Sequence, residues 1–190
     1  MIRKILVATH GSAGAVEAEQ YALDLARTLD AELHALYVIH KGWGSLVGIE
    51  WLHSSETRMT FFRYAETELY RMANTALAEF AQRAEAAGLT ITTSVRVGDL
   101  EPIIAGEAAE LGADLIVLGS ACQGWSREYK AKVSMKKLMS AAPCSVLQVK
   151  ASAGSDNSAL TGKGCVSEKA VSQKKRNLAG PTYRREKTVL

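Results

Sequence analysis

Short apolar runs alternate along the chain with longer segments in which apolar residues recur every three or four positions. The apolar runs occupy 4–11, 32–40, 113–120 and 144–150, and the segment 89–99 alternates apolar with polar, often β-branched residues. Short apolar runs between turn residues are typical of strands buried on both faces of a parallel sheet. The pattern therefore predicts five β-strands.

Helical spacing fills the intervals between these strands. We expect helices over 15–29, 57–87, 101–111 and 130–141, with Ser12 as the N-cap of the first. A glycine follows the second and third helices and favours their termination. In the longest helix the predicted apolar face consists of Met59, Phe62, Ala65, Leu69, Met72, Ala76, Phe80 and Ala84.

The alternation of strands and helices predicts an α/β fold. We expect a doubly wound, Rossmann-like sheet of five mostly parallel strands, with helices on both faces and right-handed crossovers. The globular domain should span residues 1–150. Residues 151–190 are rich in Ser, Gly, Lys and Arg and have little apolar periodicity, so we expect a disordered, basic tail.

Charge is unevenly distributed between these two parts. The whole chain carries a formal net charge of +3, but residues 151–190 hold eight Lys and Arg against three Asp and Glu. The domain is therefore slightly acidic, and nucleic acid is not an expected partner of its surface. The basic tail is a candidate contact for an acidic protein partner, with a solvated tail as the simpler alternative.

The chain shows no pattern of a membrane, metal or disulfide protein. No apolar run approaches the roughly 18–20 residues of a membrane span, and the first residues lack a signal-peptide core, so we expect a cytoplasmic protein. The three cysteines form no CxxC pair, and no two histidines have HxxxH spacing, which argues against a metal site.

The candidate functional residues lie just after the first and fourth predicted strands. The segments "ATHGSAG" and "LGSACQG" follow those strands and lead towards helices. In an open parallel sheet, ligands bind beyond the carboxyl ends of the strands, and helix N-termini favour phosphate. No nucleophile and acid accompany His10 in sequence, so no catalytic residue is expected. Cys122 is an alternative candidate, as a redox thiol near a helix N-terminus.

Several stretches of the chain resemble the universal stress protein family. They are "KILVATHGS" near the start, "VRVGD" at the third strand, "GADLIVLGS" in the fourth strand and "APCSVLQV" at the end of the domain. Their order and spacing fit over residues 1–150. The resemblance implies the same five-stranded fold and a nucleotide pocket at the carboxyl ends of the strands.

The nucleotide motif of that family is only partly present. Nucleotide-binding members carry G-x2-G-x9-G-[ST] after the fourth strand, and with Gly119 as its first glycine the distance to "APC" matches without an insertion. Cys122 and Lys132 then occupy the other two glycine positions, and Val133 occupies the hydroxyl position. His10 stands where an aspartate usually ends the first strand and meets the nucleoside.

These departures weaken a phosphate site for physical reasons. A Cβ at Cys122 or Lys132 obstructs close approach of the backbone, and Val133 has no hydroxyl to donate. The ammonium of Lys132 could attract an anion electrostatically, but it does not replace the backbone amides that a glycine-rich loop brings close to a phosphate. One lost charge-assisted phosphate contact costs roughly 1.5–3 kcal/mol, which is roughly ten- to a hundredfold in affinity. The family also has a branch that lacks the motif and does not bind ATP, and by these positions the chain resembles that branch more closely.

The resemblance implies a non-catalytic stress-response or regulatory protein with weak or no ATP binding and no required cofactor. It also implies a homodimer formed through the last strand, Ser145–Val149, and an apolar edge strand favours such pairing on its own. Two alternatives stay open. One is an ATP- or AMP-binding switch, and the other is an adenine-nucleotide enzyme of related fold, although "THGSAG" is not the SGGxDS-type loop that such an enzyme would need.

If a nucleotide is bound, the resemblance places a defined set of residues around it. This set is Ala8, Thr9, His10, Gly11, Val38, Leu118, Gly119, Ser120, Cys122, Lys132, Val133 and Ser134.

Overall fold

A computed structural model of the chain describes residues 1–42, 55–120 and 133–150. The strands are β1 (Lys4–Thr9), β2 (Glu32–His40), β3 (Ile91–Gly98), β4 (Leu115–Gly119) and β5 (Ser145–Val149). The helices are α1 (Ala13–Leu29), α3 (Ser55–Ala86), α4 (Leu100–Leu111) and α5 (Met135–Ala141). The prediction of a disordered tail lies outside the described residues, as do Cys122 and Lys132.

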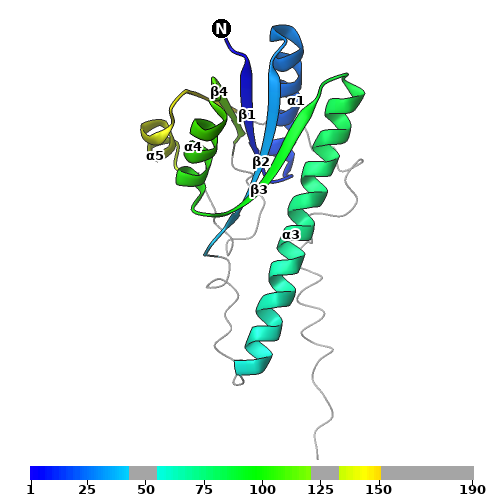
Figure 1. Ribbon diagram of the computed structural model, residues 1–190, viewed down its shortest axis with the longest axis vertical. Coiled ribbons are helices and arrows are strands. Elements are labelled where there is room, and N and C mark those ends of the chain that lie inside the picture. Colours follow the sequence, from blue (N-terminus) through cyan, green and yellow to red (C-terminus); the bar gives the residue numbers. More distant parts are fainter. Residues whose placement is uncertain (43–54, 121–132, 151–190) are drawn as a thin grey trace, which may run out of the picture. The chain divides into compact units, whose positions relative to one another are not determined.

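The five strands form one sheet in the order β3-β2-β1-β4-β5, and every neighbouring pair is parallel. The chain winds outward from β1 to β3, then returns across β1 to build β4 and β5 (Figure 1). The direction of winding therefore reverses between β1 and β4. This reversal is the switch point at which doubly wound sheets place ligands, and it confirms the predicted fold class.

Side chains along β1 alternate between two hydrophobic layers, because successive strand residues point to opposite faces. Ile5 and Val7 join the layer beneath α1 and α3, which includes Phe80. Leu6 joins the other layer, whose helical members include Ile104 of α4 and Leu138 of α5. Figure 1 shows α1 and α3 on one side of the sheet and α4 and α5 on the other.

The predicted helices are all present, with two corrections. α5 begins at Met135 rather than at 130, and Ser134 precedes it in an extended conformation. Met59 and Met72 were predicted to face the core but are 61% and 45% exposed. The buried positions of α3 are Ala73, Leu77, Phe80 and Ala84. Met72 directly precedes Ala73 and so points about 100° away from it around the helix, whereas Met59 lies in the half of the helix before the first buried residue.

The helix termini follow the expected capping chemistry. The hydroxyl of Ser12 accepts a hydrogen bond of 3.3 Å from the backbone nitrogen of Ala15, which confirms the predicted N-cap. Gly112 ends α4 in the left-handed conformation, with φ of 62°. None of the helices in the described ranges combines the length and the apolar character needed to cross a membrane.

Candidate functional site

The carboxyl ends of β1 and β4 lie side by side at the switch point. Ala8 is paired in register with Leu118, so the residues that follow each strand emerge together. Val38 adjoins them on β2, one position beyond Tyr37, which is paired with Thr9. The structure thus brings together the predicted pocket residues of β1, β2 and β4.

Gly119 is held in close contact with the start of α1. A Cβ on Gly119 would lie 2.2 Å from the carbonyl oxygen of Gly14, and a Cβ on Gly14 would lie 2.7 Å from the carbonyl oxygen of Ser120. Neither position can accept a side chain without a backbone shift. Glycine at 119 is therefore required by the packing of α1 on β4, whether or not a phosphate binds there.

The turn after β1 places a desolvated imidazole at the position of the family aspartate. Burial lowers the pKa of His10, so the neutral imidazole is favoured over the imidazolium. Gly11 follows in the left-handed region at φ +72°, and a Cβ there would approach the Cβ of Ala76 on α3 to 3.0 Å. The imidazole of His10, which favours its neutral form, and the tight turn at Gly11 thus follow β1. The resemblance to the family implies an aspartate at the position of His10.

Val133 occupies the last position of the predicted motif, and Ser134 lies one residue past it. Val133 is partly buried and packs against the hydrophobic layer that contains Leu138. Ser134 is the N-cap of α5, but its side chain makes no capping hydrogen bond. Its backbone nitrogen instead donates a hydrogen bond of 2.7 Å to Oε1 of Glu101, a residue of α4.

The contact between Glu101 and Ser134 places a carboxylate beside the start of α5. The amide one residue past the motif therefore already has an anionic partner from the chain itself. A second anion at this amide would compete for the same hydrogen bond and be repelled by the carboxylate. Sequence reasoning missed Glu101, because its partner lies 33 positions away.

A buried carboxylate beneath β1 was also missed. The side chain of Glu19 is only 1% exposed, accepts a hydrogen bond from the hydroxyl of Thr9, and pairs with the guanidinium of Arg83 on α3. The Thr9 hydroxyl in turn accepts a hydrogen bond of 3.3 Å from the backbone nitrogen of Gly11. This network ties the turn after β1 to α1 and α3.

Desolvation raises the pKa of Glu19, and the contacts with Thr9 and Arg83 oppose that rise. The sequence carried one signal for this residue. Glu19 stands at helical spacing within the buried series Ala15, Ala22 and Ala26 of α1, where a charged side chain requires a partner. The identity of that partner was not readable from the pattern.

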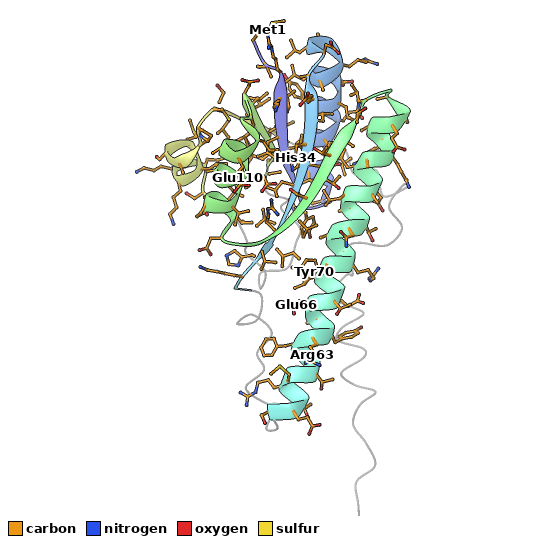
Figure 2. The ribbon with its side chains drawn as sticks, in the orientation of Figure 1. Met1, His34, Arg63, Glu66, Tyr70 and Glu110 are labelled. Carbon is orange, nitrogen blue, oxygen red and sulfur yellow. The ribbon has the colours of Figure 1, made fainter. Side chains whose placement is uncertain are left out.

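A second polar cluster lies on the opposite face, between β2, β3 and α4. Glu107 is buried and accepts hydrogen bonds of 2.9 Å from Ser94 and 2.8 Å from Nε of Arg96. Nε2 of His34 lies 3.3 Å from the same carboxylate, and its Nδ1 lies 2.6 Å from the hydroxyl of Thr92. Figure 2 shows His34 amid the strands and Glu110, one helical turn beyond Glu107, on α4.

The cysteine that the structure describes is structural in character. Cys144 is free and partly buried, and packs against the hydrophobic layer beneath α4 and α5. Burial raises the pKa of its thiol, which favours the unreactive protonated form.

Comparison with known proteins places these observations in a family context. The model of the universal stress protein family matches residues 1–150. A universal stress protein UspA from Lactobacillus plantarum is 22% identical, with 78% of this chain and 97% of that chain covered and a TM-score of 0.59. No curated protein sequence matches significantly.

Two further structures of similar fold were solved with nucleotides. A universal stress protein in complex with cAMP is 22% identical, with 80% of this chain and 99% of that chain covered and a TM-score of 0.54. A family protein from Arabidopsis thaliana with AMP bound is 19% identical, with 80% and 93% covered and a TM-score of 0.56. At these identities the likeness establishes the fold.

Proposed function

Because the chain belongs to the universal stress protein family, we propose that it is a non-catalytic regulatory protein of the stress response that binds adenine nucleotides weakly or not at all. The observation that carries this proposal is the hydrogen bond from the Ser134 amide to Glu101. It gives the backbone nitrogen one residue past the predicted motif an anionic partner from within the chain.

Three other features support weak nucleotide binding. Val133 has no hydroxyl and contributes apolar surface to the core instead. His10 has no carboxylate to offer a ribose, and burial favours the neutral form of its imidazole. Gly119 is explained by its contact with Gly14. The surviving glycine is thus weak evidence for a phosphate site.

An ATP- or AMP-binding switch is the second candidate. The observation that favours it is that two structures of similar fold contain cAMP and AMP. Gly119 and Ser120 also lie at the switch point beside the turn of His10 and Gly11. In this alternative Lys132 neutralises the phosphate, and Glu101 leaves the Ser134 amide when the nucleotide enters.

We place the protein in the cytoplasm as a homodimer formed through β5. In the sheet order β5 is an edge strand, bonded on one side to β4. Leu147 and Val149 are partly buried, so an added strand would cover more of their apolar surface. The basic residues 151–190 are the part of the chain suited to an acidic protein partner.

Thermal unfolding with ATP, AMP or cAMP and Mg²⁺ tests the proposal. A ligand present at about 100 times its Kd stabilises the native state by about 2.7 kcal/mol. We expect no change in Tm at millimolar nucleotide. A Tm increase of several degrees with one nucleotide would support the switch instead.

A further inference from the structure

Only the second half of α3 is covered by the sheet. Its buried residues are Ala73, Leu77, Phe80 and Ala84, whereas the half before Ala73 runs on beyond the ends of the strands (Figure 1). Of the eight large exposed apolar side chains in the described ranges, four belong to this helix: Met59, Tyr64, Tyr70 and Met72. Leu69 packs against the core, but no residue of 55–72 is fully buried, and helices in proteins gain most of their stability from such packing.

The face that α3 buries against the sheet continues into this exposed half. Tyr70 lies three positions before Ala73, and Glu66, Arg63 and Met59 precede it at further helical steps. At about 100° per residue, these four side chains stay within roughly 40° of the direction of Leu77. Figure 2 shows Arg63, Glu66 and Tyr70 along this part of the helix. Met59 is 61% exposed and Tyr70 is 38% exposed.

The order of these four residues is self-complementary. The series Met59, Arg63, Glu66, Tyr70 has steps of four, three and four residues, and reads apolar, basic, acidic, apolar. Consider a second copy of the helix that runs antiparallel, with a two-fold axis passing between Arg63 and Glu66. Each Arg63 then faces the other copy's Glu66. Each Met59 then faces the other copy's Tyr70. A two-fold axis makes both contacts twice, as an isologous interface requires.

The charges on this face are not compensated within the described part of one chain. Among the described residues, no ion pair involves Arg63 or Glu66, whereas Arg71 and Glu68 pair at 2.9 Å on another side of the helix. Arg63 and Glu66 are therefore available to a partner of matching pattern. The chain itself has that pattern, and an antiparallel copy supplies both opposite charges at the required spacing.

We propose that residues 59–70 of α3 form an antiparallel helix–helix interface with a second copy of this chain. The two exposed apolar residues at the ends of the series provide the buried surface, and the central Arg63–Glu66 pairs determine the register. This interface lies on a different element from β5 and does not depend on nucleotide binding. Its failure would therefore leave the proposed function untouched.

Charge reversal followed by charge exchange tests the interface in the full-length chain. Arg63→Glu and Glu66→Arg each place like charges opposite one another, and we expect either variant to raise the Kd of self-association roughly tenfold or more. The exchanged variant Arg63→Glu/Glu66→Arg restores both pairs and should recover the wild-type mass. An equimolar mixture of the two single variants should also associate, because each supplies the charge that the other lacks. Sedimentation velocity measures all four samples.

Glu85→Arg is the matched control, since it reverses an exposed charge on the sheet-bound half of the same helix. It should leave the mass unchanged, and circular dichroism should show native helix content in every variant. Single reversals that keep the wild-type mass at about 100 μM would overturn the proposal, and because β5 is unaltered in them, this outcome is distinct from a failure of the β5 dimer. So would single variants that dissociate but show no recovery on exchange or mixing.

Discussion

The carboxylate of Glu101 accepts a hydrogen bond of 2.7 Å from the backbone nitrogen of Ser134. The contact joins the first turn of α4 to the residue that caps α5. It gives the amide at the start of α5 a negative partner, and its removal is the simplest change that should alter the anion affinity proposed for this region.

The variant Glu101→Gln should bind nucleotide more tightly than the wild type. The amide side chain keeps an oxygen acceptor for Ser134 but removes the charge that repels phosphate. We expect a gain of roughly three- to tenfold in ATP affinity, since about 1.4 kcal/mol corresponds to tenfold. Glu110→Gln, an exposed change on the same helix, serves as the control. Equal affinities for the two variants in isothermal titration calorimetry would argue against competition by Glu101.

Gly119→Ala should destabilise the fold strongly. Its Cβ would lie 2.2 Å from the Gly14 carbonyl oxygen, so α1 must move away from β4. We expect a loss of about 2–3 kcal/mol in the free energy of unfolding, as for overpacked core sites. Gly106→Ala is the matched control. It meets no atom within 4 Å inside α4 and should be stabilising by about 0.5–1 kcal/mol. Urea denaturation compares the two, and a tolerated Gly119→Ala would contradict the packing argument.

Arg83→Met should leave the carboxylate of Glu19 buried without its ion-pair partner. We expect a cost of about 1–3 kcal/mol at neutral pH, below the value for a fully buried pair because Arg83 is 35% exposed. The pKa of Glu19 is already raised by desolvation and should rise further. A group with a raised pKa contributes stability at low pH and loses it as the pH rises through the folded-state pKa. The deficit of the variant should therefore shrink on acidification.

The double variant Arg83→Met/Glu19→Gln provides the control for this charge effect. It has no carboxylate at position 19, so its stability relative to the wild type should recover at neutral pH and vary less with pH. Urea midpoints measured across the acidic range give both curves. If the deficit of Arg83→Met were the same at every pH, packing of the arginine rather than its charge would explain it.

Stability should fall on acidification because of the cluster around His34 and Glu107. Burial lowers the pKa of His34 despite the opposing Glu107 carboxylate. The unfolded state therefore binds a proton first as the pH falls below about 6.5. Burial raises the pKa of Glu107, but hydrogen bonds from Arg96 and Ser94 outweigh it and the net shift is downward. This second contribution is present above the unfolded pKa and is lost at more acidic pH.

His34→Gln separates the two windows of this pH dependence. The variant should lose the part of the dependence near pH 6.5 that belongs to His34, keep the part that belongs to His10, whose pKa burial also lowers, and keep the more acidic one that belongs to Glu107. Urea denaturation between about pH 8 and pH 4 records both windows. An unchanged slope near pH 6.5 in the variant would show that another group titrates there.

Val146→Lys should disrupt the proposed β5 dimer. A charge on an edge strand opposes strand addition, so we expect about half the wild-type mass by light scattering. Val97→Lys, a change to an exposed valine of the other edge strand β3, should leave the mass unchanged. Equal masses for both variants and the wild type would count against pairing through β5.

Element order and fold class could be predicted because each strand has a local apolar signature and each helix a local period. The neighbouring carboxyl ends of β1 and β4 could also be predicted, because parallel strands end at the same edge of a sheet. The stripe on α3 was partly wrong because the fully buried residues of that helix begin only at Ala73. Met59 lies in the half before the first of them, and Met72 points away from the neighbouring Ala73.

The contacts that define the candidate site could not be predicted from local pattern. Gly14 of α1 contacts Gly119 of β4 only when α1 is packed on the sheet. Glu101 reaches Ser134 only when α4 and α5 are packed beside each other. The position of Glu19 among buried residues indicated that it needs a partner. The sequence did not identify that partner as Arg83, which lies 64 positions away. Such pairs are set by tertiary geometry, and sequence spacing carries no information on it.

We propose that this member of the family has internal contacts in place of the phosphate contacts of its nucleotide-binding relatives. Equilibrium titration of the wild-type protein with a fluorescent ATP analogue and Mg²⁺ tests this proposal most directly. We expect no saturable binding below millimolar nucleotide, which corresponds to about −4 kcal/mol or weaker. A micromolar Kd that is lost on substitution of Ser120 or Lys132 would contradict it.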